Sequence, residues 1–189
     1  RRPQRSPQVV SSAASDVDKR QLLHWLIAVL IIAGFILGLV MTDIPGFTMA
    51  KLKYYSWHKW IGVTVFMLAI ARVAWRSTHT PPLPQALMPA WQEKAALVAH
   101  WLLYFLIFAV PLSGYFYSLA AGVPVVYFGV IPLPVLIAKN EALRDALQLL
   151  HVTLNYTMAG LVGIHSLAAL KHQFFDRDGT LARMLPFLK

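Results

Sequence analysis

The sequence predicts an all-α integral membrane protein, a four-helix bundle with both termini in the cytoplasm. Of its 189 residues, 58% are hydrophobic, and the mean hydropathy of +0.57 is too high for an ordinary soluble domain. Four apolar segments each reach the roughly 20 residues that a helix needs to cross a bilayer, and charges are nearly absent from their centres. We expect helices at residues 20–41, 55–75, 91–119 and 147–175.

The basic residues predict the orientation of these helices, because cytoplasmic segments of membrane proteins are enriched in Lys and Arg. The formal net charge is +9, with 17 Lys and Arg residues. Twelve of them fall on the predicted side of both termini: Arg1, Arg2, Arg5, Lys19, Arg20, Arg72, Arg76, Lys94, Lys171, Arg177, Arg183 and Lys189. The other side holds five: Lys51, Lys53, Lys59, Lys139 and Arg144. The bias places both termini in the cytoplasm, and nucleic-acid binding is not needed to explain the charge.

The segments around the predicted helices differ in composition. Residues 1–18 are rich in Ser, Pro, Gln and Arg, which predicts a disordered cytoplasmic tail ahead of a domain at 19–189. Residues 77–90 contain a proline-rich stretch that is typical of a stiff, extended linker. Residues 120–146 form a long external connection in which prolines and glycines interrupt an apolar stretch. That stretch cannot span the membrane as a helix, so we expect it to lie in the interface or fold back over the bundle.

The sequence contains no cysteine. This excludes disulfides, thiolate zinc sites, iron–sulfur clusters and covalently attached c-type haem. The eight Asp and Glu residues lie outside the centres of the predicted spans. A metal held inside the membrane would therefore depend on histidine.

The histidines of the fourth segment, His151 and His165, are fourteen residues apart and share nearly one helix face. Their separation along the helix axis is about 21 Å, which places one near each membrane boundary. Ionisable groups at such positions are costly and usually functional. By the predicted topology, His24 matches the depth of His165, and His58 matches the depth of His151. Two b-type haems, each with two axial histidines, would satisfy all four positions, because bundles build cofactor sites from facing helices.

Further residues are predicted to lie at depths similar to those of the two histidine pairs. Arg72 follows His58 by fourteen residues, so it would either bind a haem propionate or extend to the cytoplasmic interface. His100 could replace His24 as a ligand, bond a propionate or serve only in packing. Four glycines would leave room for a flat macrocycle, or would simply let the helices approach closely: Gly38, Gly62, Gly114 and Gly163.

With these histidines, the chain resembles the bacterial cytochrome b561 family, four-helix di-haem proteins of the inner membrane. The matching motifs are LHWL at 23–26, HKWIG at 58–62, Arg72 with TPP at 80–82, His100 to Gly114, and His151 through His165 to HQFF at 172–175, followed by DGTL at 178–181 and RMLP at 183–186. The likeness covers about residues 19–187 and is closest to the superoxide oxidase branch. It implies two haem b groups, with His24 and His165 on one and His58 and His151 on the other.

The resemblance further implies an oxidoreductase that passes electrons from superoxide at the periplasmic face to ubiquinone. The external cations would steer the anionic substrate, unless they are ordinary solvated residues: Lys51, Lys53, Lys59, Lys139 and Arg144. Ubiquinone would lie near Arg72, Lys171 and His172, unless His172 is a plain interfacial histidine. The alternative function is an electron relay between the quinone pool and a periplasmic or membrane redox protein. A compact basic external surface would favour superoxide, whereas a broad apolar face at 123–137 would favour docking of a protein.

Overall fold

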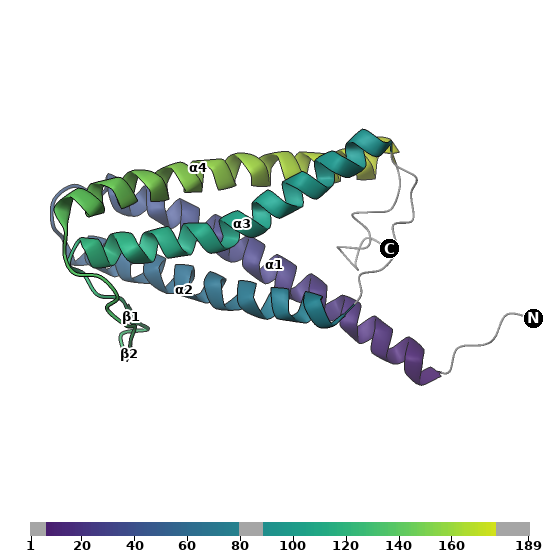
Figure 1. Cartoon of the computed structure of the whole chain (residues 1–189), viewed down its shortest axis with the longest axis horizontal. Helices are drawn as coiled ribbons and strands as arrows, with labels where there is room; N and C mark the ends of the chain where they lie inside the picture. The colour runs from purple at the N-terminus through teal and green to yellow at the C-terminus, as the bar shows by residue number, and fades with distance from the viewer. Residues whose placement is uncertain (1–6, 80–88, 177–189) are drawn as a thin grey trace, which may run out of the picture.

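The computed structural model describes residues 7–79 and 89–176, and in it four long helices form a bundle (Figure 1). The helices are α1 (Pro7–Asp43), α2 (Met49–Thr78), α3 (Ala90–Ala120) and α4 (Glu141–Lys171). A two-stranded antiparallel hairpin, β1 (Val126–Tyr127) and β2 (Ile131–Pro132), lies between α3 and α4. A π-helical turn, η1 (His172–Asp176), extends α4. We call the end that carries the hairpin the hairpin end and the opposite end the distal end.

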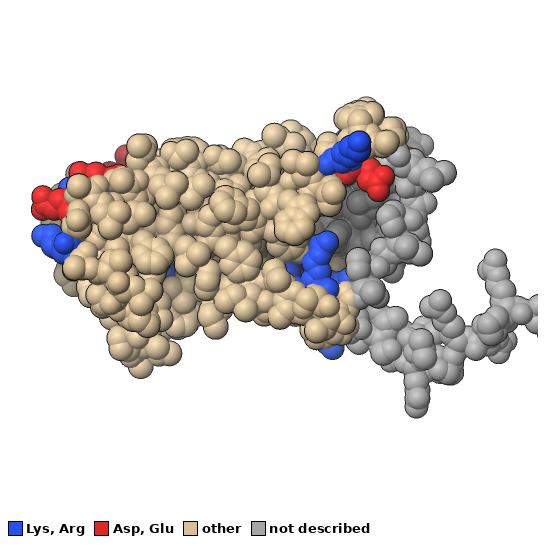
Figure 2. Space-filling view, viewed as in Figure 1, with Lys and Arg blue, Asp and Glu red and all other residues tan. Residues whose placement is uncertain are grey.

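Each of the four helices is long and apolar enough to cross a membrane, which confirms the predicted all-α, four-span fold. No more than 11% of the most apolar window of any span is buried inside the bundle, so the apolar surface faces outward, as lipid requires. Figure 2 shows that charged residues on the viewed face gather toward the two ends and leave the middle almost uncharged.

α1 begins at Pro7, well before the predicted start at residue 20. Residues 7–18, for which the composition indicated a disordered tail, are therefore helical in the structure. Proline suits the first turn of a helix, where its missing N–H would have no partner, and extending an existing helix carries no nucleation cost. Residues 1–6 of the predicted tail lie outside the described residues.

α2 and α4 also begin earlier than predicted, at Met49 instead of residue 55 and at Glu141 instead of residue 147. Both early starts have a side-chain cap. Thr48 accepts a hydrogen bond from the backbone N–H of Lys51, and Asn140 accepts one from Leu143. These caps satisfy N–H groups that a helix start leaves unpaired, so the helices begin in the polar flanks of the apolar segments.

The external connection folds back beside α2 and α3 at the hairpin end (Figure 1). The indole Nε1–H of Trp60 donates to the carbonyl of Val126 at 2.8 Å, and the hydroxyls of Thr64 and Tyr127 are 2.9 Å apart. Val125 is 2% exposed. The tip of the hairpin turns through Gly129 at φ 74°, in the left-handed region that glycine adopts without steric cost.

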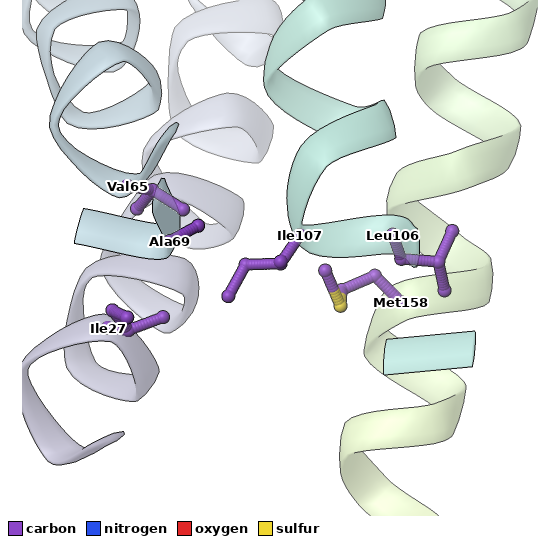
Figure 3. Packing of buried hydrophobic residues seen from close by; sticks show 6 residues of the cluster. All are labelled: Ile27, Val65, Ala69, Leu106, Ile107 and Met158. Carbon is purple, nitrogen blue, oxygen red and sulfur yellow. The ribbon is translucent and has the colours of Figure 1, made fainter. Parts of the chain in front are cut away.

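The packed core lies midway along the bundle, where all four helices contribute (Figure 3). Its buried members are Ile27, Val65, Ala69, Leu106, Ile107 and Met158. This core separates two groups of histidines, one toward each end of the bundle.

Candidate metal centres

Four histidines form two cross-helix pairs. His58 of α2 and His151 of α4 face each other toward the hairpin end, with ring centres 6.1 Å apart and planes at 90°. His24 of α1 and His165 of α4 face each other toward the distal end, with ring centres 6.3 Å apart and planes at 66°. The structure thus brings together the histidines that were matched by depth in the sequence.

Both separations fit one metal ion between two imidazoles. A metal–imidazole bond is about 2.0–2.1 Å and the ring centre lies about 1.1 Å behind the nitrogen, so the two ring centres would be about 6.3 Å apart. Because aromatic rings that simply pack also have centres about 4.5–7 Å apart, the distance does not decide by itself. The hydrogen bonds of the rings and the space around them give further evidence.

At the hairpin-end pair, Nδ1 of each ring bonds to the backbone. Nδ1 of His58 is 2.9 Å from the carbonyl of Gly34, and Nδ1 of His151 is 3.1 Å from the carbonyl of Val110. A carbonyl only accepts, so Nδ1 carries the proton in both rings and Nε2 is left as an unprotonated ligand atom. The buried hydroxyl of Ser113 lies 3.1 Å from the same nitrogen of His151 and donates to Val110 at 2.8 Å. This is the arrangement usual for metal-binding histidines.

A cavity of about 290 Å³ adjoins the hairpin-end pair, and all four helices line it. Gly62 and Gly163 belong to its wall, and a Cβ added at either would meet nothing within 4 Å. Their missing side chains therefore keep space open. Gly114 has a different role, because a Cβ there would lie 2.7 Å from Cε1 of His151, and one at Gly38 would lie 3.4 Å from Cε1 of His58. These two glycines let the imidazoles lie against the neighbouring backbone.

At the distal pair a third imidazole is close. The ring centre of His100, on α3, is 5.6 Å from that of His165, with the planes at 69°. No set of three or more His, Cys, Asp or Glu side chains placed to hold a bare metal ion occurs within residues 7–79 and 89–176. A pair of imidazoles suits a metal whose other ligands come from a macrocycle.

Beside the distal pair, two arginines of α2 converge on one tyrosine of α3. Nε of Arg72 is 3.3 Å and Nη1 of Arg76 is 3.5 Å from the hydroxyl of Tyr104, and both guanidinium groups lie over its ring. Arg72 also interacts electrostatically with His24 and His165. Sequence reasoning identified Arg72 but missed the other two residues. The signal was present, since Arg76 follows Arg72, and Tyr104 follows His100, by one helical turn.

Lys171 and His172 meet an acid that the sequence analysis left out. The ammonium of Lys171 and Nδ1 of His172 lie 2.7 and 2.9 Å from the same carboxylate oxygen of Asp176. The π-helical turn brings Asp176 back toward these two residues. The cluster therefore joins two basic groups through one carboxylate at the distal end.

The five predicted external cations do not form a uniform basic surface. Lys51 donates to the carbonyl of Ile44 at 2.8 Å, and Arg144 pairs with Asp145 at 2.9 Å. Figure 2 accordingly shows acidic and basic side chains next to each other at the hairpin end. The remaining three cations differ in setting: Lys53 lies over the ring of Trp57, the stem of Lys139 packs near Gly122, and Lys59 is half-buried directly after His58.

Comparisons with known proteins agree with this arrangement. Residues 20–187 match the family model described as prokaryotic cytochrome b561. The chain is 37% identical over 162 residues to cytochrome b561 homolog 2 of Escherichia coli (strain K12), covering 86% of each chain. It is 31% identical over 169 residues to a probable superoxide oxidase of Yersinia pestis, covering 87% of this chain and 92% of the relative. It is 26% identical over 164 residues to cytochrome b561 homolog 1 of Escherichia coli, covering 87% and 93%.

Proposed function

The chain belongs to the prokaryotic cytochrome b561 family of haem-binding, electron-transferring proteins of the bacterial inner membrane, and on this premise we propose that it is a superoxide oxidase. In the proposed reaction, two superoxide anions each give up one electron and leave as O₂. One ubiquinone takes up the two electrons and two protons and becomes ubiquinol. The observation that carries the proposal is the presence of two facing histidine pairs, one toward each end of a single bundle.

We assign one haem b to each pair, which His58 and His151 would hold at the hairpin end and His24 and His165 at the distal end. A haem bound at either pair would supply reversible one-electron redox chemistry. The carbonyl bonds of His58 and His151 hold their ligand atoms in place, and the glycine-lined cavity provides space for a macrocycle.

At the distal end we propose His24, and not His100, as the partner of His165. The ring centre of His24 is 6.3 Å and that of His100 is 5.6 Å from the ring centre of His165, so both lie within reach of it. We assign His24 because its depth along the predicted span matches that of His165. His151 and His165 are about 21 Å apart along α4. The two ligand levels therefore extend across most of the roughly 30 Å hydrocarbon core.

For superoxide we propose the hairpin end, which the charge bias of the sequence orients toward the periplasm. Lys59 is half-buried and adjacent in sequence to His58, and no acidic partner for it occurs among the described residues. A positive charge there attracts a small anion toward the edge of the hairpin-end pair. The relative named as a probable superoxide oxidase adds support for this substrate.

For ubiquinone we propose the distal end, near Arg72, Lys171 and His172. Reduction of a quinone requires protons as well as electrons. The cluster of Lys171, His172 and Asp176 provides polar side chains for a quinone headgroup at this end.

A second function, an electron relay to a protein partner, is favoured by the hairpin. Its tip exposes large apolar side chains, with Phe128 60%, Val130 78% and Ile131 55% exposed. Exposed apolar patches of this kind mark docking or membrane contacts. In this alternative the same haem pairs would exchange electrons between the quinone pool and a redox protein.

One assay separates the two functions. The purified protein is mixed with a superoxide source and a soluble ubiquinone analogue, and ubiquinol formation and O₂ release are followed with and without superoxide dismutase. We expect ubiquinol formation that dismutase abolishes. Two b-haems without superoxide-driven quinone reduction would leave only the relay, and a protein purified without haem from haem-replete cells would contradict both functions.

A further inference from the structure

We propose that Tyr104, Arg72 and Arg76 form the binding site for the two propionate carboxylates of the haem at the His24–His165 pair, with the phenol O–H as a third donor. The inference rests on the proposed function only in requiring a haem at this pair. It does not depend on superoxide or on ubiquinone.

The first observation is that two positive charges are held at one point. Arg72 and Arg76 are four residues apart on α2, where like charges repel. Both nevertheless turn toward the hydroxyl of Tyr104, at 3.3 and 3.5 Å, and both lie over its ring. No carboxylate pairs with either guanidinium in the part of the chain that the structure describes. Arg72 is half-buried and Arg76 is exposed at the distal end of α2, and two cations held at one point without a counter-charge suit an anionic ligand.

The second observation concerns the hydrogen of the phenol. The oxygen of Tyr104 receives N–H groups from both arginines, so its own O–H remains to be donated. Within the described residues this hydrogen has no acceptor. The cluster therefore presents guanidinium N–H groups and one O–H to a single region, and carboxylate oxygens are acceptors suited to such donors.

The third observation is the position of the cluster beside the distal imidazoles. Arg72 interacts electrostatically with His24 and His165, and Arg76 does so with His100. A haem b carries two propionates, so its two negative charges match the two arginines. The phosphate of a lipid headgroup has similar anionic chemistry, but the proximity to the proposed ligands favours propionate.

The test uses Tyr104→Phe, which keeps the ring and removes only the hydroxyl. Apoprotein is reconstituted with haem b or with its dimethyl ester, in which both carboxylates are blocked, and the midpoint potential of each haem is measured by optical titration. With haem b, we expect the equilibrium constant for reduction of the distal haem to fall about threefold. At about 59 mV per tenfold change, this lowers its midpoint potential by about 28 mV. The reason is that the lost O–H leaves more negative charge on the propionate, which disfavours the ferrous state. With the ester we expect no shift.

Two further variants sharpen the test. Arg76→Gln should lower the distal potential of the haem b form more than Tyr104→Phe does. Arg20→Gln is the matched control. Arg20 lies at the same end, but its guanidinium donates to the backbone carbonyl of His79 at 3.0 Å. This substitution should leave the distal potential unchanged.

Three results would overturn the inference. One is no change with haem b in Tyr104→Phe. Another is an equal change with haem b and its ester, as a lipid phosphate at the cluster would give. The third is a wild-type protein without a distal haem, which would also refute the haem assignment and so is distinguishable from the other two.

Discussion

Gly114 allows a direct test of the hairpin-end pair, because its Cα lies against the ring of His151. The substitution Gly114→Ala would place a Cβ 2.7 Å from Cε1 and 3.0 Å from Nδ1 of that ring. Ordinary van der Waals contact begins at 3.4 Å, so the ring of His151 must move away from the new Cβ by about 0.7 Å. Such a movement would stretch the 3.1 Å bonds from Nδ1 to Val110 and Ser113 beyond hydrogen-bond range.

The same retreat would exceed the roughly 0.2 Å tolerance of a metal–ligand bond. We therefore expect haem binding at the hairpin-end pair to weaken by about 10–100-fold, as when a metal ligand loses its supporting bonds. The assay is the haem-to-protein ratio of the purified variant, with its reduced-minus-oxidised spectrum and its helix content. Gly160→Ala is the matched control, because a Cβ there meets nothing within 4 Å and this glycine does not line the cavity. A Gly114→Ala protein that retains two haems with wild-type spectra would refute the reasoning.

Three further predictions concern the ligands and the substrate. His151→Ala should remove only the hairpin-end haem, measured as half the wild-type haem content with the distal spectrum intact; loss of both or neither would contradict the pairing. His100→Ala should retain both haems whereas His24→Ala should lose the distal one, and the reverse pattern would make His100 the ligand. Lys59→Gln should lower the rate of superoxide-driven quinone reduction several-fold and weaken its dependence on salt concentration, because the charge that attracts superoxide is lost. An unchanged rate with an unchanged salt dependence would exclude Lys59 from this role.

The spans and histidine pairs followed from the sequence because both depend on distance along a helix. A span needs about 20 apolar residues, and fourteen residues correspond to about 21 Å of depth whatever the helices pack against. Depth alone was therefore enough to predict that His58 lies near His151 and His24 near His165, but it did not exclude His100, whose ring centre is 5.6 Å from that of His165.

Features that depend on helix rotation or on local caps could not be predicted in the same way. The contact of Ser113 with His151 and the convergence on Tyr104 require the relative rotation of two helices, which spacing within one helix does not fix. The early start of α4 depends on the cap at Asn140. The contact of Asp176 with His172 lies in a π-helical turn, where the α-helical period no longer applies.

The central claim is that each histidine pair holds one haem through two imidazoles. The most direct measurement is the haem-to-protein ratio of the purified protein, combined with electron paramagnetic resonance of its ferric state. The account predicts two haems per chain, both low-spin, with the strongly anisotropic signal of perpendicular imidazole planes from the hairpin-end pair, whose rings are at 90°. A single haem per chain, or a high-spin signal from an iron with one axial histidine, would contradict it.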